Sequence, residues 1–324
     1  MGNAAPRAKP FRFFASASHV TGAAAGDVAR RAEAAGYDAI LIADHLRDSL
    51  GPIAFMAYAA AVTKSLKIGN AVLNNDLRHP IVLAQELAAI DQLSGGRLIV
   101  GIGAGWKEDE YRMAGLRYDS PGVRIERLGE SLRVLKQVFQ GQVDVAGEHY
   151  TVGGFGEFIR TVQQPHPPFM IGGGARKSLS LAAREGDIVG ITLRMGPGGT
   201  SDLSSATPAA TDQKLQWVRE AAGERFDDLE IHTVPVFGGA LVTDAGKAQI
   251  RSLVDRHNSV SEQPITEEEV AASPHVFVGS IDQIVEKLEM VRERWGINII
   301  SLDEPYGSGR FDEFIPIVQR MTGK

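Results

Sequence analysis

The sequence of 324 residues contains no cysteine. This absence excludes a disulfide framework, a zinc or iron–sulfur site with cysteine ligands, and a thiol nucleophile. Any redox chemistry must therefore be carried by a bound organic cofactor. A chain without disulfides is typical of a reducing compartment, so we expect a cytoplasmic protein.

Long apolar segments and an excess of positive charge are missing as well. The longest apolar run, near residues 53–62, is too short to span a bilayer, and residues 1–10 lack the apolar core of a signal peptide. Lys and Arg number 34 against 40 Asp and Glu, which gives a formal net charge of -6 at pH 7. We therefore expect neither a membrane nor a nucleic-acid partner.

Motifs for two common kinds of catalysis are absent too. The 8 histidines form no HExxH or other ligand spacing with carboxylates, so we expect no metal site. No GxSxG motif occurs, which disfavours a serine hydrolase of the α/β type. Glycine, by contrast, is plentiful, with 36 residues, and its placement guides the search for a site.

Apolar runs typical of strands alternate with helical patterns along the chain. The predicted strands are 11–15, 37–43, 66–73, 97–103, 169–172, 187–193, 229–237 and 297–302. Eight strand-then-helix units predict an α/β fold, a (β/α)8 TIM barrel over residues 11–324, after a flexible arm at 1–10. A doubly wound sheet, the competing fold, would place a glycine-rich phosphate loop after the first strand, where this chain has none.

One segment departs from this alternation. Residues 196–212 are rich in Gly, Ser, Thr and Pro and poor in large apolar residues. We interpret them as a mobile lid or insertion over the pocket, followed by a helix at 213–222.

In a TIM barrel the active site lies at the C-terminal ends of the strands. The candidates at those ends are Ser16, Asp44, His45, Asn70, Ala71, Val72, Asn74, Gly105, Trp106, Gly172, Gly173, Gly174, Ala175, Thr192 and Arg194. Of these, His45 is the natural general acid or base, because histidine titrates near neutral pH. Since successive strand residues point to opposite sides, one of Asp44 and His45 can face the pocket while the other orients it.

Two glycine clusters follow strands. Gly172–Gly174 with Arg176 lies between a strand and a helix, where bare backbone N–H groups and the helix dipole favour an anion such as phosphate. A tight turn alone would need one glycine rather than three. The GIGAGW run (101–106) is either a flat wall for a planar ring or a face kept small by packing, and Trp106 favours the ring wall.

Several blocks carry a resemblance to a known family. They are FRFFA (11–15), AAGYDAILIADH (34–45), IGNAVLNNDLRHP (68–80), LAAIDQLSGGRLIVGIGAGWKEDEYRMAG (87–115), IGGGARKSL (171–179) and GINIISLDE (296–304). With them the chain resembles the bacterial luciferase-like monooxygenase superfamily, and within it the actinobacterial class of coenzyme F420-dependent oxidoreductases. The resemblance implies F420, or alternatively FMN, as cofactor.

The resemblance also implies roles for particular residues. Asp44 matches a position near the deazaflavin, His45 a position beside the site of hydride transfer, and Asp109 a contact to the cofactor tail. Ala71-Val72 matches a non-proline cis peptide held against the back of the ring. Gly173, Gly174 and Ala175 match the cofactor phosphate loop.

Departures from the pattern bear on the substrate. Relatives that oxidise a sugar phosphate carry a Trp a few residues after the histidine and an acid at the position of Trp106, whereas this chain has Ser49 and Trp106. We therefore expect a larger or more apolar small molecule, such as a natural product, with Ser16, Asn74, Thr192 and Arg194 on the substrate side.

Three alternatives stay open at this point. An FMN-dependent monooxygenase would use reduced flavin and O2, and a non-catalytic subunit of a heteromer would bind cofactor without chemistry. A phosphosugar isomerase or lyase barrel would place its phosphate site after strands seven and eight. A homodimer is compatible with the resemblance.

Overall fold

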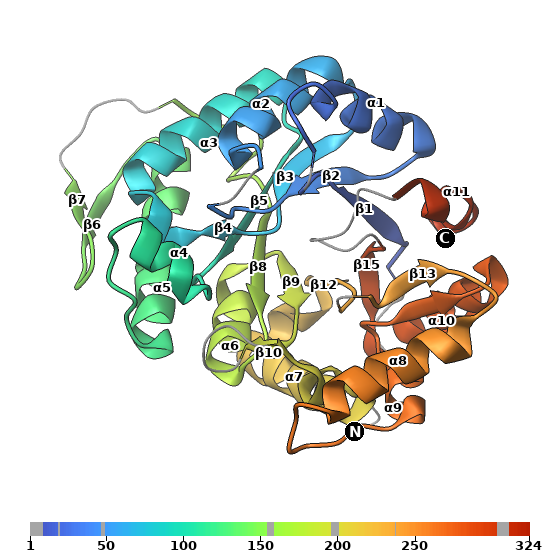
Figure 1. The fold of residues 1–324 in the computed structure, drawn as a ribbon. Helices are drawn as coiled ribbons and strands as arrows, with labels where there is room; N and C mark the ends of the chain where they lie inside the picture. The colour runs from blue at the N-terminus through green and yellow to red at the C-terminus, as the bar shows by residue number, and fades with distance from the viewer. Residues whose placement is uncertain are drawn as a thin grey trace.

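Eight parallel strands close into a barrel at the centre of the molecule (Figure 1). The computed structural model describes residues 9–18, 20–46, 49–153, 159–195, 201–236, 238–302 and 311–324. The barrel strands are β1 (Arg12–Ser16), β2 (Ala39–Ile42), β3 (Lys67–Asn70), β5 (Leu98–Gly103), β8 (Phe169–Gly173), β9 (Ile188–Ile191), β12 (Glu230–Thr233) and β15 (Ile297–Ser301). Each pairs with the next in the chain, and β15 pairs with β1. The predicted TIM barrel is confirmed.

Helices surround the barrel as an outer layer (Figure 1). They are α1 (Ala25–Ala35), α2 (Pro52–Val62), α3 (Pro80–Ser94), α5 (Pro121–Phe139), α6 (Arg176–Glu185), α7 (Pro208–Ala222), α10 (Ile281–Trp295) and α11 (Ile315–Met321). Five of them carry proline in the first turn, where the missing N–H costs nothing and the fixed φ suits a helix. Gly36, Gly95 and Gly296 end α1, α3 and α10 in the left-handed conformation that favours glycine.

The barrel strands are buried on both faces, which explains their continuous apolar runs. Phe14, Leu41, Ile99, Met170 and Ile299 pack together in one cluster. Their neighbours along the same strands belong to the larger cluster that the helices cover. The alternation gives a filled barrel interior and a separate core between strands and helices.

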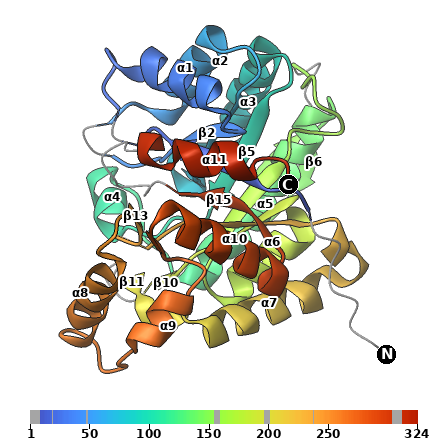
Figure 2. The same cartoon turned by 90° about the vertical axis from the view of Figure 1, so that its right-hand side faces the viewer.

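Short elements extend the end of the barrel that carries the site. They are β4 (Leu73–Asn74), α4 (Glu108–Met113), β10 (Arg194–Met195), β11 (Ser201–Asp202), the 3-10 turn η3 (Leu203–Ala206), β13 (Ala240–Val242), α8 (Gly246–Asn258), α9 (Glu267–Ala272) and β14 (Phe277–Gly279). Figure 2 shows α4, β10, β11 and α8 gathered at one end of the molecule. The hairpin of β6 (Asp144–Ala146) and β7 (Thr151–Gly153) lies outside the helix layer (Figure 1).

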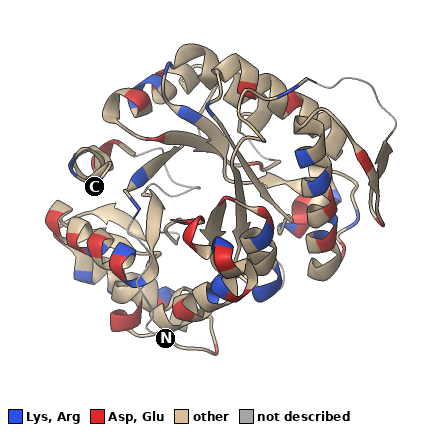
Figure 3. Ribbon diagram, turned by 180° about the vertical axis from the view of Figure 1, so that it is seen from behind, with Lys and Arg blue, Asp and Glu red and all other residues tan. Residues whose placement is uncertain are grey.

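Acidic and basic residues alternate over the outer helices in the view of Figure 3. Within the described part of the chain, no helix combines the length and the apolar character needed to cross a membrane.

The segment predicted as a lid is partly regular structure. Residues 196–200 lie outside the described residues, but Ser201–Asp202 pairs antiparallel with Arg194–Met195. Helix α7 begins at Pro208 rather than at 213, because Thr207 accepts a hydrogen bond from the N–H of Ala210 and proline occupies the first turn. The predicted helix start at 213 is therefore wrong, because the start signal at Thr207-Pro208 was overlooked. The lid over 196–212 stays a prediction.

Two strand boundaries also differ from prediction, and the predicted arm is largely undescribed. The seventh strand ends at Thr233 instead of residue 237, since Pro235 has no N–H for a ladder. The third is divided into β3 and β4. Residues 1–8 of the predicted arm lie outside the described residues, while Lys9 donates to the carbonyl of Leu229.

Glu33 joins α1 to the loop before β3 and makes stability depend on pH. Partial burial raises the pKa of Glu33, but hydrogen bonds from the N–H groups of Ser65, Leu66 and Lys64 outweigh it and lower the pKa to about 2. A lowered carboxyl pKa stabilises the fold above the unfolded pKa, and that stabilisation is lost as pH falls from about 4.5 towards 2. We expect Glu33→Gln to lose about 1 kcal/mol of unfolding free energy at pH 7, allowing for solvent screening. Urea unfolding at pH 7 and pH 3 tests this, since equal deficits at both values would contradict it.

Candidate active site

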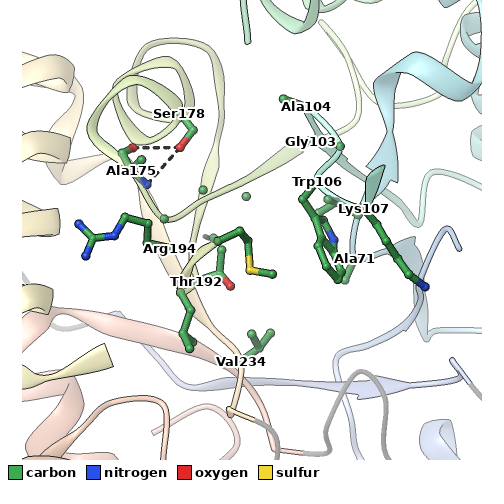
Figure 4. A pocket seen from close by; sticks show the side chains of 18 of the residues that line it. Ala71, Gly103, Ala104, Trp106, Lys107, Ala175, Ser178, Thr192, Arg194 and Val234 are labelled. Atoms are coloured by element: carbon green, nitrogen blue, oxygen red, sulfur yellow. Dashed lines mark hydrogen bonds between the residues drawn. The ribbon is translucent and has the colours of Figure 1, made fainter. Parts of the chain in front are cut away.

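A pocket of about 1110 Å³ lies at the C-terminal ends of the barrel strands. It is lined by residues that follow β2, β3, β5, β8, β9 and β12. Figure 4 shows Ala175 and Ser178 on one side of it and Trp106 with Ala71 on the other. Pockets for a single small ligand are usually about 300–1,000 Å³, so this one has room for a cofactor and a substrate together.

His45 is held on the pocket wall by a buried carboxylate. Its Nδ1 lies 2.8 Å from Oε1 of Glu110, a side chain only 3% exposed. Nζ of Lys107 lies 3.2 Å from the same oxygen. The His45 ring also meets the edge of Trp106, with 5.8 Å between centroids and an angle of 83°. An imidazole whose orientation is set by a buried acid is the usual arrangement of a general acid or base.

Asp44 points to a different partner. Its carboxylate forms a bidentate pair with Arg78, at 2.6 and 3.1 Å, and accepts the N–H of Asn74 at 3.0 Å. Asp44 therefore fixes the chain at β4 beside the pocket, and the carboxylate that contacts His45 is that of Glu110.

The wall after β3 is formed by an unusual backbone. The peptide between Ala71 and Val72 is cis, as the resemblance implied, and both residues line the pocket. Gly103 lies against this wall, because a Cβ there would come within 2.8 Å of Cγ2 of Val72. The side chain of Val72 leaves no room for a larger residue at Gly103.

The glycines of 101–105 have different reasons to be glycine. A Cβ at Gly101 would lie 1.8 Å from the carbonyl oxygen of Asn70, and Gly101 does not line the pocket. Gly105 adopts φ +72° and borders the pocket. The interpretation of a flat glycine wall is therefore wrong at Gly101, where packing decides, while Gly103 and Gly105 do form the wall.

Arg124 is a cation buried in the pocket wall. It is 4% exposed, its guanidinium donates to the carbonyl of Gly105 at 2.8 Å, and it lies 4.1 Å from the ring of Tyr118. Its Nε has no hydrogen-bond partner, and no carboxylate of the described residues pairs with it. A buried guanidinium without a counter-charge is a candidate anion site.

The glycine-rich turn after β8 lines the same pocket as Arg124. Lys177, in the first turn of α6, contacts Gly122 and Glu126 in the first turns of α5, and so brings the two helix starts together. Gly172–Ala175 and Ser178 line the pocket. The backbone of this turn and the Arg124 side chain thus border the same pocket.

Two of the three glycines in this turn are also needed by the fold itself. A Cβ on Gly173 would lie 2.5 Å from Oγ of Ser178, and one on Gly174 would lie 2.2 Å from the carbonyl oxygen of Leu193. A Cβ on Gly172 would meet only Cγ1 of Val72, at 3.7 Å. A bulky residue at Gly173 would therefore disturb the fold as well as ligand binding. A replacement at Gly172 tests the effect on ligand binding by itself.

The structure places four predicted residues away from the pocket. Asp109 is exposed and pairs with Arg112, and Arg176 is exposed and pairs with Glu220. Asn70 is fully buried, and its side chain donates a hydrogen bond to the carbonyl of Gly101, which links β3 to β5. Ser16 contacts Ser18. None of the four lines the pocket.

The segments that follow β9 and β12 form the side of the pocket away from Trp106. Thr192, Arg194 and Val234 line this side (Figure 4). The buried Lys214 donates to the carbonyls of Thr192 and Ser205, and burial lowers its pKa to about 8. His232 stacks on Phe14, and burial lowers its pKa to about 3, which favours the neutral imidazole.

The residues that sequence reasoning missed are Glu110, Lys107 and Arg124. Arg124 had a usable signal, since it falls on the apolar stripe of α5 four residues before Leu128, where a charge is unexpected. Glu110 had no usable signal in the sequence, because nothing in its acidic run distinguishes it from Glu108 and Asp109. Among the described residues, no group of three or more His, Asp or Glu side chains could hold a metal ion.

Fold and site together define the class of protein. It is a TIM barrel whose pocket is lined by the contacting side chains of His45 and Glu110, a glycine-rich turn and the buried guanidinium of Arg124. The chain belongs to the luciferase-like monooxygenase family, whose model matches residues 10–299.

Individual relatives differ in the chemistry that their names give. The chain is 29% identical to an F420-dependent glucose-6-phosphate dehydrogenase of Amycolatopsis mediterranei over 63% of this chain and 61% of that protein. It is 32% identical to an FMNH(2)-dependent dimethylsulfone monooxygenase of Pseudomonas putida, over 39% of this chain and 35% of that one. The matches thus span less than two thirds of these relatives.

Among solved structures, the coenzyme F420-dependent tetrahydromethanopterin reductase of Methanopyrus kandleri is similar in fold. Its TM-score is 0.77 at 18% identity, and the match covers 97% of this chain and 98% of that one.

Proposed function

We propose that this chain is a coenzyme F420-dependent oxidoreductase acting on a small organic molecule. The observation that carries the proposal is the joint placement of His45–Glu110 and Arg124 on one pocket. The names of the relative from Amycolatopsis mediterranei and of the reductase from Methanopyrus kandleri support this cofactor. When bound, a deazaflavin supplies a hydride acceptor or donor at ring carbon C5.

The residues present fit such a cofactor. Coenzyme F420 carries a phosphate, and Arg124, whose Nε has no partner, lines the same pocket as the turn at Gly172–Ala175, so that a cation and backbone N–H groups are available for it. The cis Ala71-Val72 segment and Trp106 offer apolar surface for the ring.

Each residue then has a defined task. His45 exchanges a proton with the substrate, while Glu110 holds the imidazole and balances its charge when it is protonated. Asp44 positions β4 through Arg78 rather than touching the reacting atoms. The apolar lining excludes water from the reacting centre.

An FMN-dependent monooxygenase is the second candidate. The description of the family model and the relative from Pseudomonas putida favour it. It would consume O2 with reduced flavin, so an oxygen electrode distinguishes it from F420 chemistry. A non-catalytic cofactor-binding subunit is a weaker alternative, because His45 and Glu110 would then have no task.

Equilibrium titration with F420, FMN and NADPH tests the cofactor. We expect micromolar binding of F420, and at least tenfold weaker binding of Gly172→Val, whose side chain would narrow the pocket opposite Val72. Gly51→Ala, at a position with open space around it, is the matched control. Micromolar FMN binding without F420 binding would overturn the assignment.

A further inference from the structure

The two ends of the pocket differ in chemistry. The end that carries His45, Lys107, Glu110 and Arg124 is polar and charged. The other end is lined by apolar side chains from the segment after β9, β10, η3, the segment after β12, α8 and the turn after α8. We call these the distal wall: Leu193, Met195, Leu203, Val236, Leu253 and Val260.

The distal wall is backed by a core of its own. Leu193, Val236 and Leu253 belong to a buried cluster with Val254 and Ile265, and Leu203 packs against it. This cluster is separate from the main core of the barrel. The wall is therefore preformed, and a ligand would meet packed hydrocarbon rather than a loose loop.

The charged groups near the distal wall are already engaged. Arg194 forms an ion pair with Asp202 at 2.5 Å, and its guanidinium extends away from Trp106 (Figure 4). Lys214 donates to two carbonyls, and Nε2 of His257 contacts the carbonyl oxygen of Gln263 at 2.9 Å. Arg256 lies exposed at the rim.

These contacts decide what the distal end can hold. A phosphate or carboxylate placed there would lose its hydration against hydrocarbon, with no buried cation to compensate it among the lining residues described. Hydrocarbon buried on the same wall is favourable, at about 25 cal/mol per Å².

We infer that the substrate is a neutral, mainly apolar alcohol, or the corresponding ketone or aldehyde, whose hydrocarbon part lies on the distal wall. The inference rests on the proposed function. Oxidation of such an alcohol breaks one C–H and one O–H bond and forms a C=O bond. The hydride reduces the oxidised deazaflavin, and the proton passes to His45.

A series of unbranched 2-ketones tests the distal wall directly. Binding of 2-butanone through 2-nonanone to the F420-loaded protein is measured by calorimetry, with a hexose 6-phosphate as the charged comparator. We expect affinity to rise by up to about fourfold per added methylene, and no saturable binding of the sugar phosphate at millimolar concentration.

Two variants localise the effect. Val260→Asp, at a position 85% exposed, and Leu203→Gln are expected to flatten the dependence of ketone affinity on chain length. Leu93→Asp, at a position 70% exposed that does not line the pocket, is the matched control and should behave as wild type.

The outcomes separate the two proposals. Affinity that rises less than twofold per methylene, or tighter binding of the sugar phosphate than of every ketone, overturns the inferred substrate class. If F420 does not bind, the proposed function fails, and the same ketone series on the cofactor-free protein still reports on the distal wall.

Discussion

Replacing His45 with alanine is expected to lower turnover by about 10²- to 10⁴-fold, the usual contribution of a general acid or base. The reason is the geometry of the pair, in which Glu110 holds Nδ1 of His45 at 2.8 Å on the pocket wall. Cofactor affinity should change by less than about threefold, since proton transfer and not binding is removed. Stopped-flow kinetics and fluorescence titration measure the two quantities separately.

Two further measurements distinguish catalysis from a structural role. Added imidazole should restore part of the turnover of His45→Ala, because the vacated space opens on the pocket. Glu110→Gln keeps the shape but removes the charge, and it should lower kcat more than it raises KM. If turnover of His45→Ala equals that of wild type, His45 has no part in the reaction.

Replacing Arg124 with methionine is expected to weaken F420 binding by about 10- to 100-fold, the cost of losing hydrogen bonds from a charged group. Arg124 is 4% exposed, and its Nε is unpartnered in the pocket wall. A ligand phosphate would supply the missing counter-charge. The affinity measurement is a fluorescence titration.

The matched control changes the ligand instead of the protein. A deazaflavin without the phosphate and tail should bind wild type and Arg124→Met alike. Arg124→Lys should recover only part of the affinity for F420, because an ammonium lacks the bidentate fork. Equal losses for both ligands would mean that Arg124 only supports the wall through Gly105 and Tyr118.

Much of the fold could be predicted because barrel strands are buried on both faces. Continuous apolar runs such as AILI at 39–42 predict a strand even when the neighbouring strands are unknown. Proline or glycine marks most helix boundaries. The errors lie where a local signal was overlooked, at Thr207-Pro208, and where pairing stops for lack of an N–H, at Pro235.

The candidate site was predictable only in part. Its location followed from the fold class, because the ends of parallel strands in a barrel meet at one face. The position of the cis peptide at Ala71-Val72 followed from the resemblance and is confirmed. The partners were not predictable: sequence reasoning placed Asp44 in the catalytic pair and Asp109 and Arg176 at the cofactor, and the structure turns all three towards arginine or glutamate partners.

Residue order alone was enough to predict the barrel, to exclude cysteine chemistry, and to predict the face of the barrel that carries the pocket. These depend on residue type and on periods of two and 3.6 residues, which are local properties. Only the tertiary structure decided that Glu110 rather than Asp44 contacts His45, across 65 positions of the chain, and that Arg124 is buried without a counter-charge. It also decided that the distal wall is apolar. Such contacts depend on where separate strand–helix units meet in space, and no local pattern encodes that meeting.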